Sequence, residues 1–222
     1  MTERAVHPFQ FVSCIELRQA VGRRALDERE LMDRLEEVPA GSIFYHTHGY
    51  FLRHRPVTTA YGNDFAAWVA VHVRDQALAE RLAVINPFES RDIEDLREEL
   101  VSTIQDHLDH VAVVPQVQFG DPFYFQQSHI VEIELGTPVT TLAEFRATLA
   151  DADSSAIYMH MVEARARLGR RSSDFAEWIG TSLGLTALAE QIGRIDTYMT
   201  SLERVRARIL SLVDAVLEGG TE

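Results

Sequence analysis

Hydrophobic and polar residues follow two different periods along this chain. Apolar and acidic residues alternate strictly in Val131–Leu135, and a period of two is typical of a β-strand with one buried face. Residues 17–21 keep the same phase less cleanly, and Gly22 and Gly136 stand where each segment is predicted to end in a turn. Elsewhere the spacing is helical, and Thr141, with a glutamate three residues later, has the pattern of a capping box. The chain is therefore predicted to combine a little sheet with many helices.

The second half of the chain repeats landmarks of the first half in the same order. The spacing is 114 residues up to Arg53, and it shortens to 110 and then 109 after a longer loop in the first half. This fixed order predicts a tandem duplication of a unit of roughly 100 residues. The aligned landmarks are Pro8–Phe11 with Pro122–Phe125, Gly22 with Gly136, His46 with His160, Arg53 with Arg167, Asp64–Trp68 with Asp174–Trp178, Glu94 with Glu203 and Arg97 with Arg206.

Each half is expected to contain one strand and about five helices. Since an isolated two-stranded piece is unstable, the two strands are predicted to pair with each other on a shared core. The fold class is then mainly α with a small antiparallel β element (α+β), packed about a pseudo-two-fold axis. Repeat unit one is placed at 8–110, a linker at 111–121 and repeat unit two at 122–217. The predicted helices cover 27–38, 42–54, 77–83 and 91–110, with counterparts at 141–150, 156–168, 187–193 and 201–217, and a further pair begins at Asp64 and Asp174.

Polar residues mark the expected helix starts. Asn63 and Ser173 each precede an aspartate, which predicts an N-cap followed by an acid at the positive end of the helix dipole. The alternative is that the carboxylate of Asp64 or Asp174 reaches His46 or His160. Ser42 and Ser154 are predicted to lie near the N-caps of the following pair of helices. The longer loop of the first half, at 55–62, is expected to be flexible or to cover a ligand.

The composition is that of an acidic globular protein. The chain has 21 basic and 34 acidic residues among 222, a formal net charge of −13. Such a surface repels phosphate backbones and anionic lipid head groups, so neither nucleic acid nor a membrane is an expected partner. No apolar run is long enough to span a membrane, and residues 1–8 lack the apolar region of a secretory signal. The single cysteine, Cys14, excludes an internal disulfide and favours a cytoplasmic location.

The histidine-rich stretch at 42–54 suggests a metal site at first sight. On a helix His46 and His48 lie about 200° apart, so they cannot chelate one ion together. His46, Tyr50 and His54 share a helical face, but the two histidines are two turns apart. A metal bridging them would need ligands from other segments, and neither a metal nor another cofactor is predicted.

His46 and His160 are aligned by the repeat and are best considered as a pair. A single imidazole in an apolar stripe usually satisfies a buried polar group. The functional alternative is a pair of facing histidines in a polar cavity between the halves, with pKa values lowered by burial and suited to acid–base chemistry. The candidate ligand pocket comprises His46, Tyr50, Arg53, His54, Asp64, His160, Glu163 and Arg167.

Two arginines follow the paired histidines by seven residues. If Arg53 and Arg167 point inward, their guanidinium groups suit a carboxylate or phosphate of a ligand. The alternative is a surface ion pair between Glu163 and Arg167, which are four residues apart on a helix. A predicted anion-contacting surface comprises Arg165, Arg170 and Arg171.

Several motifs occur in a fixed order that supports a comparison. They are Pro-Phe-x-Phe from Pro8, Ser-Ile-x-Tyr-His-Thr-His from Ser42, Asn-Asp-Phe-Ala-x-Trp from Asn63 and Leu-Ala-Glu from Leu78. With them the chain resembles a bacterial family of unknown function, domain of unknown function family 5752, over about residues 8 to 217. The second half departs from the pattern at Ser173, where an asparagine is expected. The resemblance implies kinship of fold and no particular substrate.

The sequence contains no glycine-rich phosphate loop, nucleophile elbow, zinc-protease motif or cysteine pair. The leading hypothesis is therefore an uncharacterised cytoplasmic binding or accessory protein that holds a small anionic ligand or a protein partner between its halves. The alternative is an enzyme in which His46 and His160 act as acid–base or metal-ligating groups. A third hypothesis is a helical module that forms homo-oligomers.

Overall fold

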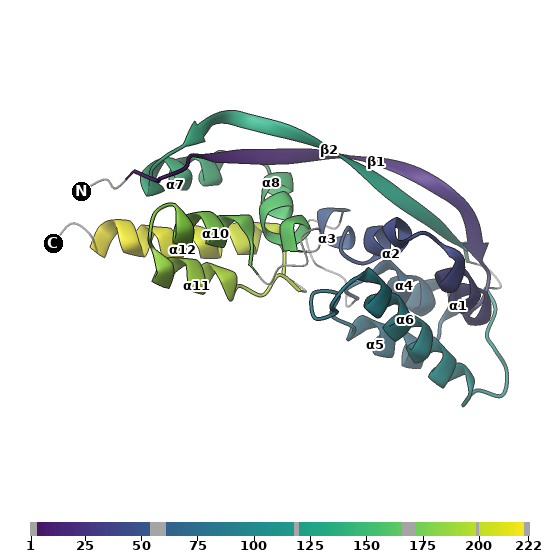
Figure 1. Ribbon diagram of the computed structural model, residues 1–222. Helices are drawn as coiled ribbons and strands as arrows, with labels where there is room; N and C mark the ends of the chain where they lie inside the picture. Colours follow the sequence, from purple (N-terminus) through teal and green to yellow (C-terminus); the bar gives the residue numbers. More distant parts are fainter. Residues whose placement is uncertain (1–3, 54–60, 118–119, 166–171, 199, 220–222) are drawn as a thin grey trace. The chain divides into compact units, whose positions relative to one another are not determined.

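A two-stranded antiparallel sheet and a set of helices make up the described part of the chain. The strands β1 (Phe9–Ala25) and β2 (Phe123–Val139) are neighbours that run in opposite directions (Figure 1). Helices account for 56% of the structure, so the predicted mainly α fold with a small antiparallel element is confirmed. The computed structural model describes residues 4–53, 61–117, 120–165, 172–198 and 200–219.

The chain divides into two compact units whose borders lie within the strands. The N-terminal unit is Glu16–His129, and the C-terminal unit joins the residues up to Ile15 to those from Ile130 onward. Each unit therefore contains part of β1 and part of β2. The predicted repeat boundaries, at 8–110 and 122–217, rest on sequence similarity and stay a prediction.

Part of the predicted linker at 111–121 is hydrogen-bonded within the N-terminal unit, at residues 116 and 117. Gln116 pairs with Asp27 in an isolated antiparallel bridge. The backbone N–H of Val117 donates to the carbonyl of Leu26 at 2.9 Å. This part of the segment therefore lies along the start of the first helix.

Four of the described helices in the N-terminal unit begin at acidic or amide side chains. Asp27, Asn63, Asp75 and Asp92 each accept a hydrogen bond from a backbone N–H in the first turn, which satisfies a donor without an intrahelical partner. The predicted cap at Asn63 is thereby confirmed. The elements are α1 (Glu28–Glu37), α2 (Ala40–His46), α3 (Tyr50–Arg53), α4 (Asp64–Trp68), the π-helix η1 (Val69–Val73), α5 (Gln76–Ala83) and α6 (Ile93–Leu108).

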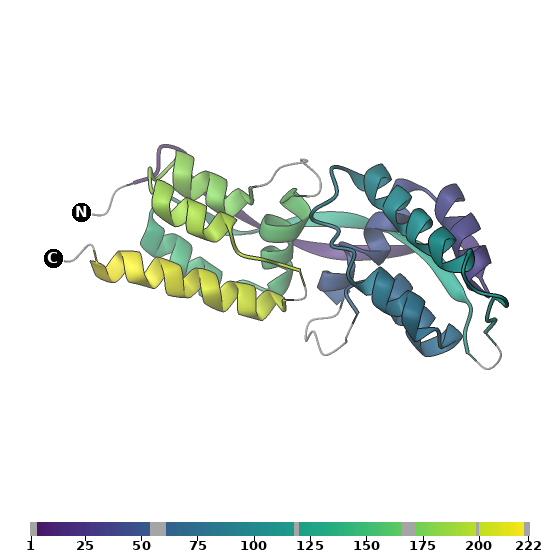
Figure 2. The same ribbon diagram turned by 90° about the horizontal axis from the view of Figure 1, so that it is seen from below.

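Helices in the C-terminal unit follow the predicted starts. The capping box is confirmed, because the Thr141 hydroxyl accepts from the Glu144 N–H and the Glu144 carboxylate accepts from the Thr141 N–H. Ser173 caps the helix from Asp174 as predicted. In Figure 2 the last two helices lie side by side. The elements are α7 (Leu142–Asp151), α8 (Ser154–Tyr158), the π-helix η2 (Met159–Glu163), α10 (Asp174–Thr181), α11 (Thr186–Gly193) and α12 (Leu202–Gly219).

The predicted turns at the two strand glycines are wrong. Gly22 and Gly136 lie inside β1 and β2, which continue to Ala25 and Val139. Their φ angles are 75° and 59°, in the left-handed region that favours glycine. Such a residue within a paired strand is typical of a local change of twist, so the strand passes through it.

The predicted single helix over 42–54 is interrupted. α2 ends at His46 and α3 begins at Tyr50, so these two residues do not share one continuous helical face. A Cβ atom at Gly49 would lie 2.8 Å from the Tyr45 carbonyl oxygen, and only glycine permits so close an approach of the backbone.

The starts of this helix and of its counterpart lie close to their predicted positions. Ser42 and Ser154 lie near the helix starts as predicted, although the N-cap residues are Pro39 and Asp153. Most of the predicted ligand-covering loop at 55–62 lies outside the described residues.

Phenylalanines from each strand fill the core of the unit whose helices come from the other half of the sequence. In the N-terminal unit Phe123 and Phe125 of β2 pack on Phe65 of α4, with ring centroids 5.2 and 6.3 Å away. In the C-terminal unit Phe9 and Phe11 of β1 pack on Phe175 of α10, at 5.6 and 5.5 Å. The two Pro-Phe-x-Phe motifs are therefore exchanged between the halves.

None of the described helices combines the length and the apolar character that crossing a bilayer requires.

Candidate functional site

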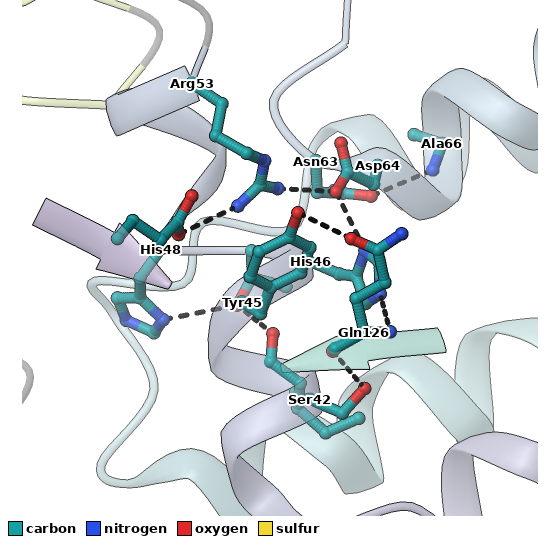
Figure 3. A network of polar contacts seen from close by, with 12 residues as sticks. Ser42, Tyr45, His46, His48, Arg53, Asn63, Asp64, Ala66 and Gln126 are labelled. Atoms are coloured by element: carbon teal, nitrogen blue, oxygen red, sulfur yellow. Dashed lines mark hydrogen bonds and ion pairs between the residues drawn. The ribbon is translucent and has the colours of Figure 1, made fainter. Parts of the chain in front are cut away.

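His46, at the end of α2, is held at both ring nitrogens (Figure 3). Its Nε2 accepts a hydrogen bond from the backbone N–H of Gln126 at 3.0 Å, and its Nδ1 lies 2.8 Å from Asp64 Oδ2. Since a backbone N–H can only donate, Nε2 carries no proton, and Nδ1–H donates to the carboxylate. The imidazole is therefore a neutral, fully bonded link between β2 and the start of α4.

The surroundings of His46 keep it neutral. The ring is 4% exposed and packs on Phe123 and Phe65, with centroids 4.7 and 5.4 Å away. Burial lowers the pKa of His46, and the hydrogen bond to Asp64 opposes that shift only in part. With both nitrogens engaged, the ring has no free position for a substrate proton or a metal ion.

His160 makes the same set of contacts in the C-terminal unit. Its Nε2 accepts from the backbone N–H of Val12 at 2.8 Å, and its Nδ1 lies 2.9 Å from Asp174 Oδ2. Phe9 and Phe175 pack on the ring, each with its centroid 4.9 Å away. Each imidazole is thus bonded inside its own unit, and the hydrogen bonds favour the interpretation of both as satisfied core histidines.

Arg53 points inward, but its partners are side chains of this protein. Its guanidinium lies 2.6 Å from Asp64 and 3.6 Å from Glu16, and its central carbon is 3.7 Å from the centroid of the Tyr45 ring. The Arg53 side chain is 13% exposed. Two carboxylates and a ring face therefore contact the guanidinium group that was a candidate contact for an anionic ligand.

The structure describes some of the other predicted pocket residues and not others. Tyr50 is buried at the start of α3, and Glu163, partly buried, ends η2. His54 and Arg167 lie outside the described residues. Of the eight predicted pocket residues, the structure brings His46, Arg53 and Asp64 together in the N-terminal unit.

One residue of the predicted anion-contacting surface, Arg165, has a structural role. Arg165 is partly buried and donates to the carbonyls of Gly193 and Ile195 at 3.0 and 3.5 Å. Arginine in this position satisfies backbone oxygens left open at the end of a helix, here α11. Arg170 and Arg171 lie outside the described residues.

An arginine-lined pocket was not predicted from the sequence. It lies in the C-terminal unit, where the C-terminal end of α11 and the residues after it meet the N-terminal part of α12. Its volume is about 560 Å³. The signal that was available is the spacing of Arg204 and Arg208, which puts both on one face of a helix. The lining residues are Gln191, Arg194, Ile195, Asp196, Thr200, Arg204, Val205, Arg208 and Leu212.

These features define a class of protein: an α+β fold with one long strand pair, two compact units and a buried His–Asp pair in each unit. The chain belongs to the family described as "Family of unknown function (DUF5752)", whose model matches residues 6–214. The family resemblance seen in the sequence is thereby confirmed, whereas bacterial origin stays a prediction.

One solved structure shows the same fold across nearly the whole chain. It is described as "The structure of OrfY from Thermoproteus tenax", with a TM-score of 0.80 and 29% sequence identity. The match covers 96% of this chain and 97% of that chain. No curated protein matches the chain. Neither the description of the family nor that of the OrfY structure names an activity.

Proposed function

We propose that this protein is a cytoplasmic binding protein that holds a small anionic ligand in the arginine-lined pocket of the C-terminal unit. The observation that carries the proposal is the gathering of three arginines around an open pocket of about 560 Å³, although one of them, Arg194, lies 3.2 Å from Glu190. Pockets of roughly 300–1,000 Å³ are the usual size for small-molecule sites.

The charge of the pocket is opposite to that of the whole chain. Arg194, Arg204 and Arg208 line it together with a single acid, Asp196, although the formal net charge of the protein is −13. Arg194 pairs with Glu190 at 3.2 Å, whereas within the described residues Arg204 and Arg208 have no acidic side chain at ion-pair distance, so these two guanidinium groups are available. Guanidinium groups bind carboxylates and phosphates through two parallel hydrogen bonds.

The rest of the pocket suits an organic anion better than a bare ion. Ile195, Val205 and Leu212 supply apolar surface, and Gln191 and Thr200 supply neutral polar groups. Apolar walls with a few convergent polar groups are typical of ligand sites. The site therefore favours a small carboxylate or phosphate ester with some apolar surface.

An enzymatic role of His46 and His160 has less support. Both imidazoles are buried, and each has one nitrogen bonded to a backbone N–H and the other to an aspartate. General acid–base catalysis requires a nitrogen within reach of the substrate. The matching contacts of the two histidines support a tandem duplication as the origin of the fold, and the pseudo-two-fold arrangement stays part of this proposal.

Calorimetric titration of the full chain tests the proposal. The probes are inorganic phosphate, citrate and a nucleoside monophosphate, and the variant is Arg204→Gln/Arg208→Gln. We expect at least one probe to bind, with affinity reduced at least tenfold in the variant, because charge-assisted hydrogen bonds are each worth about 1.5–3 kcal/mol.

A matched variant controls for overall charge. Arg18→Gln/Arg24→Gln removes two exposed arginines of β1 and changes the net charge by the same amount. Its affinity is expected to equal that of the unmodified chain. Absence of binding by every probe, or equal loss in both variants, contradicts the proposal. Light scattering alongside separates ligand binding from homo-oligomer formation.

A further inference from the structure

Three metal-binding side chains from three helices converge in the N-terminal unit. Glu28 is the first residue of α1, Asp75 is the N-cap of α5, and His107 lies in the last turn of α6. His107 Nε2 is 3.0 Å from Asp75 Oδ2 and 3.7 Å from Glu28 Oε2. One ligand atom from each residue lies within 4.8 Å of the other two.

Within the described part of the chain, Glu28 is buried without a hydrogen bond to its carboxylate, and His107 Nε2 lies 3.7 Å from its Oε2. The residue is 0% exposed, and neither carboxylate oxygen has a hydrogen-bond partner among the described residues. A buried carboxylate that accepts no hydrogen bond is unfavourable, and a cation held among the three side chains would supply the missing partner.

We propose that Glu28, Asp75 and His107 bind a divalent transition-metal ion, of which Zn²⁺ is the simplest probe. The ligand atoms are a carboxylate oxygen of Glu28, Asp75 Oδ2 and His107 Nε2. Two such ligands at about 2.0–2.2 Å from one ion are about 3.4 Å apart in tetrahedral geometry, and the observed separations lie on either side of that distance.

The chemistry of the three ligands points to this class of ion. Imidazole suits Zn²⁺ and its neighbours in the first transition row, whereas Ca²⁺ and Mg²⁺ prefer shells made of oxygen alone. Asp75 remains oriented for the role, because its other oxygen, Oδ1, accepts from the Leu78 N–H at 2.9 Å and caps α5. A bound carboxylate that is itself fixed by a second hydrogen bond is a usual feature of metal sites.

The second half of the chain shows that the same helices close without these polar residues. By the sequence repeat, Glu28, Asp75 and His107 align with Leu142, Leu185 and Val216. Leu142 is the first residue of α7 and Leu185 is the N-cap of α11, as Glu28 and Asp75 are for α1 and α5. Apolar residues stand at these positions, Leu142 buried and the other two partly buried, so the helices do not require polar groups there. The triad of the first half therefore calls for a separate explanation, which a bound cation supplies.

Metal titration of the chelator-treated full chain tests the site. Zn²⁺ or Co²⁺ alone is added under equilibrium dialysis with elemental analysis, and Co²⁺ is also followed by its visible absorption. We expect one equivalent per chain, and affinity reduced by at least about 100-fold in Glu28→Gln and His107→Gln, because even groups that only support a metal ligand are worth 10–100-fold.

Two further variants keep the test decisive. Asp75→Asn retains the side-chain oxygen that caps α5 and is expected to fold but to bind the metal at least tenfold more weakly. His110→Gln, just beyond the end of α6, removes an exposed histidine and is expected to bind as the unmodified chain does. Absence of stoichiometric metal binding, or undiminished binding by His107→Gln, overturns the proposal. The site lies in a different unit from the arginine-lined pocket, so either proposal can fail alone.

Discussion

His48 shows how burial of one residue sets a response to pH. The residue is 5% exposed. Its ring stacks on the ring of Phe44, with centroids 4.7 Å apart, and makes an edge contact with the ring of Phe88, with centroids 5.2 Å apart. This burial lowers the pKa of His48 from 6.5 to about 4. The unfolded chain therefore binds a proton between pH 6.5 and 4 that the folded chain does not, and folding stability falls as the pH falls through this window.

We predict that His48→Phe flattens the acid side of the stability profile. The shift of His48 corresponds to a loss of up to about 3 kcal/mol in the free energy of unfolding between pH 6.5 and 4. The measurement is urea unfolding at half-unit intervals from pH 7.5 to 4.5. The exposed His110→Phe serves as the control and is expected to follow the unmodified chain. Parallel profiles for all three proteins would count against this origin of the acid sensitivity.

For single residues, the sequence indicates most of the side chains that bond with His46 and Asp64. The repeat singles out His46 and Arg53, and Asp64 is among the candidates that the structure brings to them. The donor to Nε2 is not predicted, because it is the backbone of Gln126, 80 residues away. Periodicity and side-chain type carry no information about which distant N–H group a ring nitrogen will meet.

The same limit explains why the sequence does not predict the Glu28 cluster. Its three residues stand at the ends of three helices, and each has an ordinary local explanation as a first-turn acid, an N-cap or a last-turn histidine. Only the packing of α1, α5 and α6 brings them within 4.8 Å.

Among the elements, β2 is tied to α2 through a small group of polar contacts. The Ser42 hydroxyl donates to the Gln126 carbonyl at 2.8 Å, and the Tyr45 hydroxyl donates to the Gln126 side-chain oxygen at 2.9 Å. With the bond to His46, three side chains of one helix hold a single strand residue (Figure 3). This arrangement fixes the strand against the helix while Phe123 and Phe125 fill the core.

Replacement of His46 by phenylalanine is predicted to destabilise the N-terminal unit by about 2–4 kcal/mol. The change preserves the ring but leaves the Gln126 N–H without its acceptor, which costs about 1–3 kcal/mol. It also removes the hydrogen bond from the imidazole to the Asp64 carboxylate, which keeps Arg53 as a partner. Urea unfolding followed by circular dichroism measures the loss. The exposed His129→Phe is the control, and an unchanged midpoint for His46→Phe would show that the link contributes nothing.

Local patterns predict the helices better than the strand ends. Caps such as Thr141 and Asn63 act within a few residues, so the sequence alone locates them. Turns are predicted at Gly22 and Gly136 because glycine permits them, whereas each residue lies within a strand at positive φ. The continuation of a strand depends on its neighbour, which local sequence does not reveal.

For the whole molecule, the sequence repeat and the compact units are different divisions of the chain. The repeat predicts a unit at 8–110, but the N-terminal unit extends from Glu16 to His129. The difference is the exchange of Phe123 and Phe125, whose rings pack on Phe65. Sequence similarity identifies the pieces that correspond, and it cannot tell which copy of a strand packs on which set of helices.

The exchange predicts how fragments of the chain behave. A fragment of residues 1–110 lacks both phenylalanines and the Gln126 N–H that His46 accepts from, so we expect it not to fold cooperatively. Residues 16–129 contain the complete core of the N-terminal unit and are expected to unfold in one cooperative transition. Loss of two buried phenylalanines costs about 3–5 kcal/mol each, a large part of the stability of a domain of this size.

Circular dichroism during urea unfolding compares the two fragments at equal concentration. A third fragment, residues 16–129 with Phe123→Ala and Phe125→Ala, removes the strand rings without shortening the chain. We expect it to resemble residues 1–110, because the rings and not the length complete the core. The contradicting result is that residues 1–110 unfold cooperatively and are as stable as residues 16–129. The first half would then form its core without β2, and the exchange of Phe123 and Phe125 would not be required for folding.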